Sequence, residues 1–148
     1  MKFKLFFFAI CIALVSCEKD DDTNPNDSNK KETTLTIKAA TPVDGATIVA
    51  DDAFTFELEC LVCEADYDTN AKYELAVYLS GDGNSSYVDC GNKTITVSAN
   101  EASVQTINGQ LLIAPGHNSP YTIEINLYMY KNGTGTPFQL TSATIDYN

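Results

Sequence analysis

The segment YTIEINLYMY, residues 121–130, is the clearest indicator of the fold of this chain. Its inward positions recur at every second residue and are Tyr121, Ile123, Ile125, Leu127 and Met129. Because successive side chains of a β-strand point to opposite faces of the sheet, this alternation predicts a strand with one face in the core. Residues 54–62 and 72–80 alternate in the same way. No segment longer than a turn or two has a helical pattern, so the chain is predicted to be all-β.

Turn signals separate these alternating segments: PVDG, GDGN, GN, PG and KNGTG, beginning at residues 42, 81, 91, 115 and 131. Strands are therefore predicted near residues 34–40, 54–62, 72–80, 86–90, 93–98, 103–107, 120–131 and 138–147. Residues 108–113 are the candidate for a helical turn. Seven to eight short antiparallel strands at this spacing predict a single β-sandwich over residues 33–148.

The order of these features resembles an immunoglobulin-like or fibronectin type III domain. The PG pair at 115–116, the long strand that opens at Tyr121 and the final strand at 141–147 are similar to the second half of such modules. In that resemblance Tyr121 would be the tyrosine-corner residue. Residues 42–48 and the FTF stretch resemble the opening strands, with Phe56 at a position where tryptophan is common.

The first 16 residues have the pattern of a secretory signal peptide. Lys2 and Lys4 precede an apolar stretch over residues 5–15, which is shorter than the roughly 20 residues that a membrane-spanning helix needs. The LVSC stretch that ends at Cys17 resembles a bacterial lipobox, and this implies cleavage after Ser16 and acylation of Cys17. Several acyl chains on Cys17 would hold the protein firmly in a membrane. An ordinary signal peptide followed by an incidental cysteine is the alternative.

Residues 17–32 contain the lipidated cysteine and a predicted disordered tether. Residues 18–32 contain no aliphatic side chain, so they cannot bury enough apolar surface to offset the entropy lost on ordering. The EKDDD run directly after Cys17 resembles the surface-export signal of Bacteroidota-type lipoproteins. That resemblance implies an outer-membrane lipoprotein that faces the cell exterior. A solvated acidic linker, or display on the inner side of the outer membrane, are the alternatives.

The charge balance argues against nucleic acid as a partner. Removal of residues 1–16 removes two of nine basic residues and none of twenty acidic ones, which leaves 7 − 20 = −13. The chain contains no arginine, so the bidentate fork that reads phosphates and base edges is missing. The single histidine, His117, is expected in an exposed turn with no nucleophile nearby in sequence. No catalytic motif is present, so we expect neither enzyme activity nor a cofactor.

Three cysteines lie within the predicted domain, in a compartment where disulfides persist. If extended, Cys60 and Cys63 would be about 10 Å apart, beyond disulfide reach. The expected strand directions bring Cys63 and Cys90 to one edge of the fold, so a Cys63–Cys90 disulfide is predicted, with Cys60–Cys90 as the close alternative. The alternation around Cys60 argues against a redox Cys-x-x-Cys site, which begins a helix. A zinc site is disfavoured because His117 lies far along the chain.

Four oxygen-bearing side chains alternate in one loop: Glu64, Asp66, Asp68 and Asn70. Calcium binding would suit such ligands, but the glycine and the distal glutamate of an EF-hand loop are absent. A solvated acidic loop without metal is therefore predicted.

Outward-facing tyrosines are the best candidates for ligand binding. By alternation, Tyr78 lies on the polar face of one strand, and Tyr128 and Tyr130 lie on the polar face of the long strand. These two strands would be neighbours, so a shared patch is predicted. Tyrosine offers a large contact area with a polar tip, which suits sugar rings or a protein partner. Tyrosine is also a good cross-strand residue, so a purely structural role is the alternative.

A narrower resemblance supports a role in binding. The stretches FTF at 54–56, YELAV at 73–77 and INGQLL at 107–112 resemble the N-terminal immunoglobulin-like domain of starch-utilisation-system E-type outer-membrane lipoproteins. The carbohydrate-binding domains that follow in that family have no counterpart here. We therefore expect a non-catalytic binding module, as part of a glycan-capture or nutrient-uptake complex with a glycan or surface protein as partner. A structural or adhesive accessory that scaffolds other surface proteins is the alternative.

Overall fold

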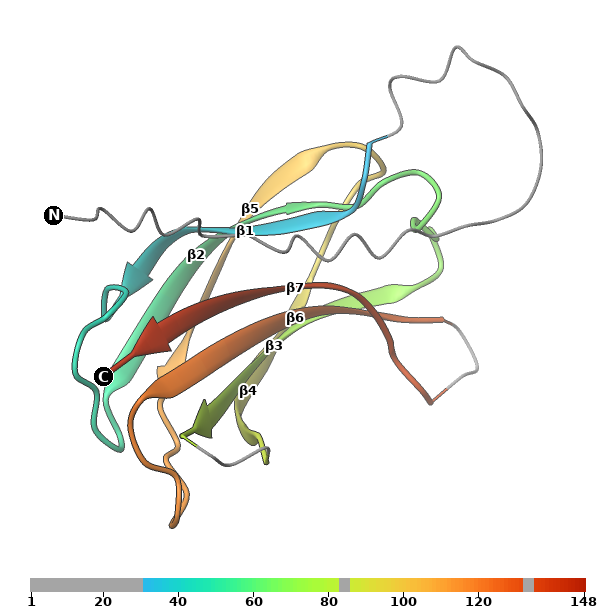
Figure 1. Ribbon diagram of the computed structural model, residues 1–148. Helices are drawn as coiled ribbons and strands as arrows, with labels where there is room; N and C mark the ends of the chain where they lie inside the picture. The colour runs from blue at the N-terminus through green and yellow to red at the C-terminus, as the bar shows by residue number, and fades with distance from the viewer. Residues whose placement is uncertain (1–30, 83–85, 132–134) are drawn as a thin grey trace, which may run out of the picture.

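The computed structural model describes residues 31–82, 86–131 and 135–148, which form two antiparallel sheets packed face to face (Figure 1). The first sheet has the order β1-β2-β5 and the second β4-β3-β6-β7. The strands are β1 (Thr34–Thr41), β2 (Ala53–Leu61), β3 (Lys72–Gly81), β4 (Val88–Ile95), β5 (Ala102–Gln110), β6 (Tyr121–Tyr130) and β7 (Phe138–Tyr147). The predicted all-β, immunoglobulin- or fibronectin III-like sandwich of seven to eight strands is confirmed.

The predicted signal peptide, Cys17 and the tether as far as residue 30 lie outside the described residues, as do residues 83–85 and 132–134 within two predicted turns. Among the described residues there is no helix, and hence no helix that could span a membrane.

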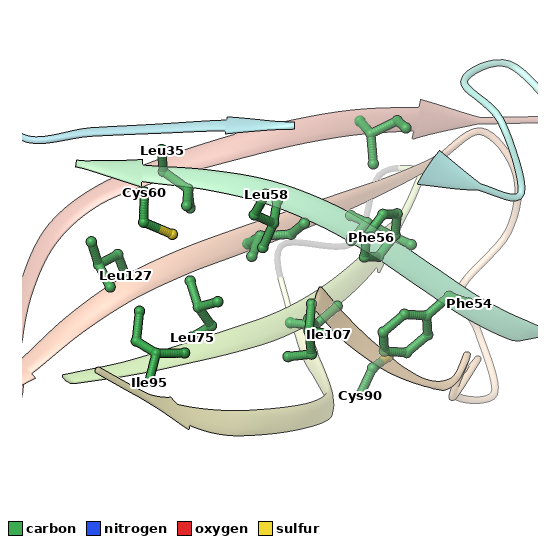
Figure 2. Close-up of a cluster of buried hydrophobic side chains, with 14 of the residues drawn as sticks. Leu35, Phe54, Phe56, Leu58, Cys60, Leu75, Cys90, Ile95, Ile107 and Leu127 are labelled. Atoms are coloured by element: carbon green, nitrogen blue, oxygen red, sulfur yellow. The ribbon is translucent and has the colours of Figure 1, made fainter. Parts of the chain in front are cut away.

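The core lies between the two sheets and is filled by alternate residues of the central strands. Figure 2 shows the cluster, in which side chains of β2 face those of β3 and β6. The Phe54 and Phe56 rings are stacked with centroids 5.2 Å apart. Fully burying a side chain of this size stabilises the fold by roughly 1.5–3 kcal/mol. The residues of β2, β3 and β6 that are at most 1% exposed are Phe54, Phe56, Leu58, Cys60, Leu75, Val77, Leu79, Ile123, Ile125 and Leu127.

Two predicted boundaries are wrong. Residues 86–90 and 93–98 were expected to form separate strands, but β4 is one strand that continues through Gly91. Gly91 has a φ of 137° and lies where the pairing of β3 with β4 shifts between Val77 and Tyr78, so the glycine serves a bulge rather than a turn. The helical turn expected at 108–113 is absent, because β5 continues to Gln110 in register with β2.

The strand directions give the sandwich two distinct ends. At one end, which we call proximal, Thr34 at the start of β1 pairs with Leu61 at the end of β2. At the opposite end, which we call distal, Tyr121 at the start of β6 pairs with Tyr147 at the end of β7. The loop at 62–71 therefore belongs to the proximal end, whereas the chain terminus belongs to the distal end.

The hydrogen bond that would make Tyr121 a tyrosine corner is not formed among the described residues. Within the part of the chain that the structure describes, the Tyr121 hydroxyl makes no hydrogen bond. Instead the Tyr147 hydroxyl donates a hydrogen bond of 2.7 Å to the Pro42 carbonyl. Tyr147 is 1% exposed, so this bond fastens the turn after β1 to the last strand inside the core.

Candidate ligand-binding face

The three predicted tyrosines lie on the outer face of the four-stranded sheet, which we call the tyrosine face after Tyr78, Tyr128 and Tyr130. Strands β3 and β6 are neighbours there, as predicted, and Glu74 pairs with Tyr128 while Lys72 pairs with Tyr130. All three tyrosines are half-buried. The sheet therefore presents them as a fixed group rather than as mobile loop side chains.

The tyrosine hydroxyls interact with one another and with a carboxylate. Burial, and after it the adjacent Tyr128 hydroxyl, raises the pKa of Tyr78 to about 12. Burial and then Glu74 raise the pKa of Tyr130 above its ordinary value. Both hydroxyls are neutral at physiological pH, as an ordinary tyrosine is, and each can donate and accept a hydrogen bond.

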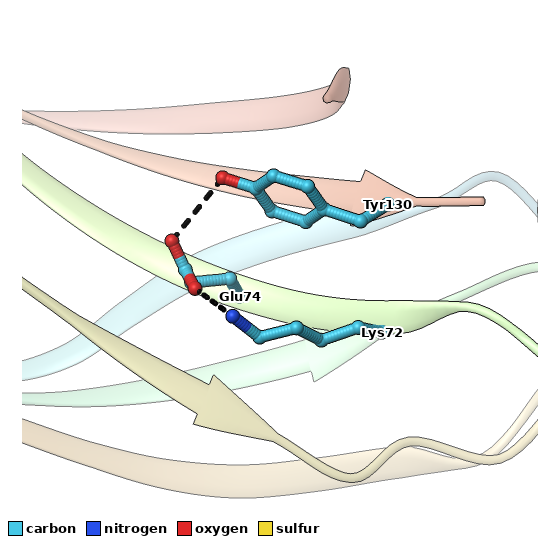
Figure 3. Close-up of polar contacts among 3 residues, drawn as sticks. All are labelled: Lys72, Glu74 and Tyr130. Atoms are coloured by element: carbon cyan, nitrogen blue, oxygen red, sulfur yellow. Dashed lines mark hydrogen bonds and ion pairs between the residues drawn. The ribbon is translucent and has the colours of Figure 1, made fainter. Parts of the chain in front are cut away.

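Glu74 is the polar centre of this face. Its Oε2 atom lies 2.5 Å from Lys72 Nζ, and its Oε1 atom accepts a hydrogen bond of 3.3 Å from the Tyr130 hydroxyl (Figure 3). Lys72 Nζ also lies 5.2 Å from the centroid of the Tyr130 ring, which is within range of a cation–π contact. The hydrogen bond to Glu74 raises the pKa of Lys72. Glu74 is 8% exposed although it points outward.

Asn126 is the second buried polar residue on this face. It belongs to β6, pairs with Ala76 on one side and Ser142 on the other, and is 3% exposed. Its Oδ1 atom is buried and has no hydrogen-bond partner among the described residues. An orphaned buried acceptor of this kind costs about 1–3 kcal/mol.

Sequence reasoning missed Glu74 and Asn126 as site residues. Alternation places both on the outer face, where polar residues are normally solvated. The available signal was their position between bulky tyrosines on the same or the neighbouring strand, because such rings cover the shorter side chains between them.

The predicted disulfide is not formed, and Cys60, Cys63 and Cys90 are buried free thiols. Figure 2 shows Cys90 beside Phe54 near the start of β2, and Cys60 near the opposite end of the cluster. Cys63 follows the end of β2. At about 3.3 Å per residue, Phe54 lies roughly 30 Å from Cys63 and roughly 20 Å from Cys60, whereas a disulfide tolerates less than about 7 Å between Cα atoms.

The reason for this error is the extent of β4. The prediction ended a strand at Cys90 and so placed the residue at the proximal end beside Cys63. The strand instead runs on to Ile95, which leaves Cys90 near its beginning and at the distal end. Burial raises the pKa of the Cys60 thiol to about 11, which keeps that thiol protonated and unreactive.

The acidic loop uses its oxygens in local hydrogen bonds. Asp66 Oδ2 accepts hydrogen bonds from the Thr33 hydroxyl at 2.5 Å and the Cys63 thiol at 3.2 Å. Asp68 Oδ1 accepts one of 2.9 Å from the Asn70 backbone amide. In residues 31–82, 86–131 and 135–148, no group of three histidine, cysteine, aspartate or glutamate side chains could hold a metal ion.

His117 is buried rather than exposed, contrary to expectation. It is 7% exposed, and its backbone amide closes a turn by donating to the Ala114 carbonyl at 3.1 Å. This turn packs against the end of β3, where a Cβ on Gly81 would lie 2.7 Å from the Asn118 backbone. The close approach of two backbones explains the burial.

No protein-family model matches this chain, and no curated protein matches its sequence.

Proposed function

We propose that this chain is a lipid-anchored protein of the outer membrane that presents a non-catalytic glycan-binding module at the cell surface. The signal peptide directs export and is removed, acylated Cys17 supplies the anchor, residues 18–32 supply the spacing, and the tyrosine face supplies the binding surface. In this role the domain serves a glycan-capture or nutrient-uptake complex.

The grouping of Tyr78, Tyr128 and Tyr130 on one rigid sheet is the observation that carries this proposal. The C–H faces of sugar rings pack on aromatic rings, and the phenolic hydroxyls can bond to sugar hydroxyls at the edge of the same contact. Tyrosine loses little conformational entropy when it binds, because it has two rotatable side-chain bonds. Half-burial of the three rings lowers that cost further.

The test is retention of the protein by polysaccharides in native affinity gels. The Tyr78→Ala/Tyr128→Ala variant should lose retention by a polysaccharide that slows the parent chain, while its melting temperature falls by no more than a few degrees. Val104→Ala is the control, because Val104 is 62% exposed and lies on β5 in the other sheet. A collapse of folding in the double variant, or equal losses in both variants, would count against the proposal.

A second pair of substitutions distinguishes the contribution of the tyrosine rings to binding from that of their hydroxyl groups. Tyr78→Phe/Tyr128→Phe keeps the stacking surface and removes the polar tips, so it should retain part of the binding. If no polysaccharide slows the parent chain, the glycan role is wrong. Chemical crosslinking in membranes would then ask whether the domain scaffolds other surface proteins.

A further inference from the structure

The two sides of the sandwich, where the edge strands of its sheets meet, are closed differently. Where β4 faces β5, Lys93 Nζ donates a hydrogen bond of 2.6 Å to the Thr106 carbonyl and so links the sheets. Where β1 faces β7, no hydrogen bond joins the two strands in the described part of the chain. A groove of about 400 Å³ lies there instead, lined by residues 37–40 of β1, the turn at 43–44 and residues 144–146 of β7.

The edge of β7 beside this groove has unpaired backbone groups. The Asp146 amide donates to Asp44 Oδ1 at 3.3 Å, and the Asp146 carbonyl accepts from the Gly45 amide at 2.8 Å, so both point away from β6. Alternate residues of an antiparallel strand point the same way, so the backbone groups of Ser142 and Thr144 also point away from β6. Neither residue has a backbone partner on that side among the described residues. Two donors and two acceptors therefore stand at the spacing of a β-ladder.

This edge also lacks the protection that the other edges have. Proteins normally prevent pairing at an edge strand with charged side chains or bulges. In β1, Lys38 lies at a bulge between Ile37 and Ala39, and β4 has its bulge at Gly91. Residues 141–145 of β7, with the sequence TSATI, contain no charge, proline or glycine and pair with β6 in regular register. The edge of β7 is therefore open to a further strand.

From these observations we propose that the edge of β7 binds an extended segment of a partner protein as an additional antiparallel strand. Apolar side chains of that segment lie in the groove, and a basic side chain lies beside Asp44 and Asp146. Both carboxylates are exposed at the distal end of the groove, where they favour a cation. The site is separate from the tyrosine face, so this inference does not depend on the proposed function.

Other segments of the same protein fit the site less well. Residues 18–32 have no aliphatic side chain to place in the groove. A second copy would offer its own β7, whose one charged residue, Asp146, is acidic and would approach the acidic end of the groove. A segment of a different protein with apolar and basic residues meets both requirements.

The geometry specifies the probe. Because β7 runs toward the distal end, an antiparallel strand begins there, and its basic residue comes first. Residues that pair with Thr144 and Ser142 direct their side chains to the outer face, as those two do, and the residues between them direct theirs into the groove. An acetylated peptide of lysine, valine, threonine, valine and threonine, in that order, has this pattern.

The experiment is a titration of the full ¹⁵N-labelled chain in detergent with this peptide, followed by NMR. The amide signals of Ser142 and Thr144 should shift and saturate. Methylation of both threonine nitrogens of the peptide removes the donors of the ladder and should weaken binding at least about tenfold. Methylation of both valine nitrogens, which point away from β7, should leave binding unchanged. Asp146→Asn should weaken binding about threefold.

A substitution at the edge gives an independent test. Ser142→Pro removes one donor at an edge position where proline is tolerated and should weaken binding about tenfold, whereas Ser142→Ala keeps the donor and should bind like the parent. If Ser142→Pro does not fold, the two methylated peptides still decide. Equal binding of those peptides, or no shift at β7 with any peptide, would overturn the proposal. A dimer of the parent chain that Ser142→Pro dissociates would assign the edge to a second copy and overturn it as well.

Discussion

Replacement of Gly109 by alanine should destabilise this domain, although alanine is the smallest possible change. Gly109 lies in β5 directly opposite Phe54 of β2. A Cβ atom at this position would lie 2.8 Å from Phe54 Cζ and 2.9 Å from Phe54 Cε1. The Phe54 ring cannot simply swing aside, because it is 1% exposed and stacked on Phe56.

The magnitude follows from the cost of overpacking a dense core. Extra methyl groups that force a side chain or the backbone to shift typically cost about 1–3 kcal/mol. Near the unfolding midpoint, a domain of about 120 residues loses roughly 4 °C in melting temperature for each kcal/mol. Gly109→Ala should therefore lower the free energy of unfolding by about 2 kcal/mol and the melting temperature by about 8 °C.

Urea denaturation followed by circular dichroism would measure this change, with Asn108→Ala as the control on the adjacent exposed position. Shortening the facing ring should relieve the clash, so Gly109→Ala/Phe54→Leu should be less destabilised than the sum of the two single variants by about 1 kcal/mol. A Gly109→Ala variant within about 0.5 kcal/mol of the parent, together with additive behaviour of the pair, would refute the packing argument.

Tyr147→Phe should lower the free energy of unfolding by about 1 kcal/mol, because the Pro42 carbonyl loses its donor. Between pH 10 and 12 the parent should lose more stability than this variant, since burial raises the pKa of Tyr147 to about 12 in the fold while the unfolded residue ionises near 10; parallel pH profiles would contradict this. The thiols of Cys60, Cys63 and Cys90 are buried and free, so alkylation followed by peptide mapping should leave them unlabelled in the native protein. In guanidinium without reductant, all three should be labelled. A disulfide-linked peptide would argue for a bridge instead.

Alternation in the sequence predicted the strands and their faces well because the sandwich buries one side of each central strand. Residues 121–130 are the clearest case, since their inward positions line the core of β6. The predicted neighbourhood of Tyr78 and Tyr128 also followed from alternation and the expected order of strands. Such features depend on the two-residue period of the apolar side chains and on the order of the strands, and both can be inferred from the sequence.

Features that depend on a single close contact were not predictable in this way. The sequence predicts a turn at Gly91 and a helical turn that includes Gly109, yet the first glycine serves a bulge and the second makes room for an aromatic ring inside a strand. The burial of Glu74 and Asn126 depends on how the tyrosine rings lie across the sheet, which alternation does not specify. The cysteine pairing failed because it depended on where β4 ends.

The path of β1 has a mechanical consequence. The strand runs from the proximal to the distal end, so a pull on the chain ahead of Thr34 acts along the strand axis. The hydrogen bonds between β1 and β2 lie across that axis and share the force in shear, whereas a pull at right angles would open them one after another. If the protein is held through residues that precede Thr34 and a partner pulls on another part of its surface, the force on β1 would act along the strand. The hydrogen bonds to β2 resist removal of β1 from the sheet best in that direction.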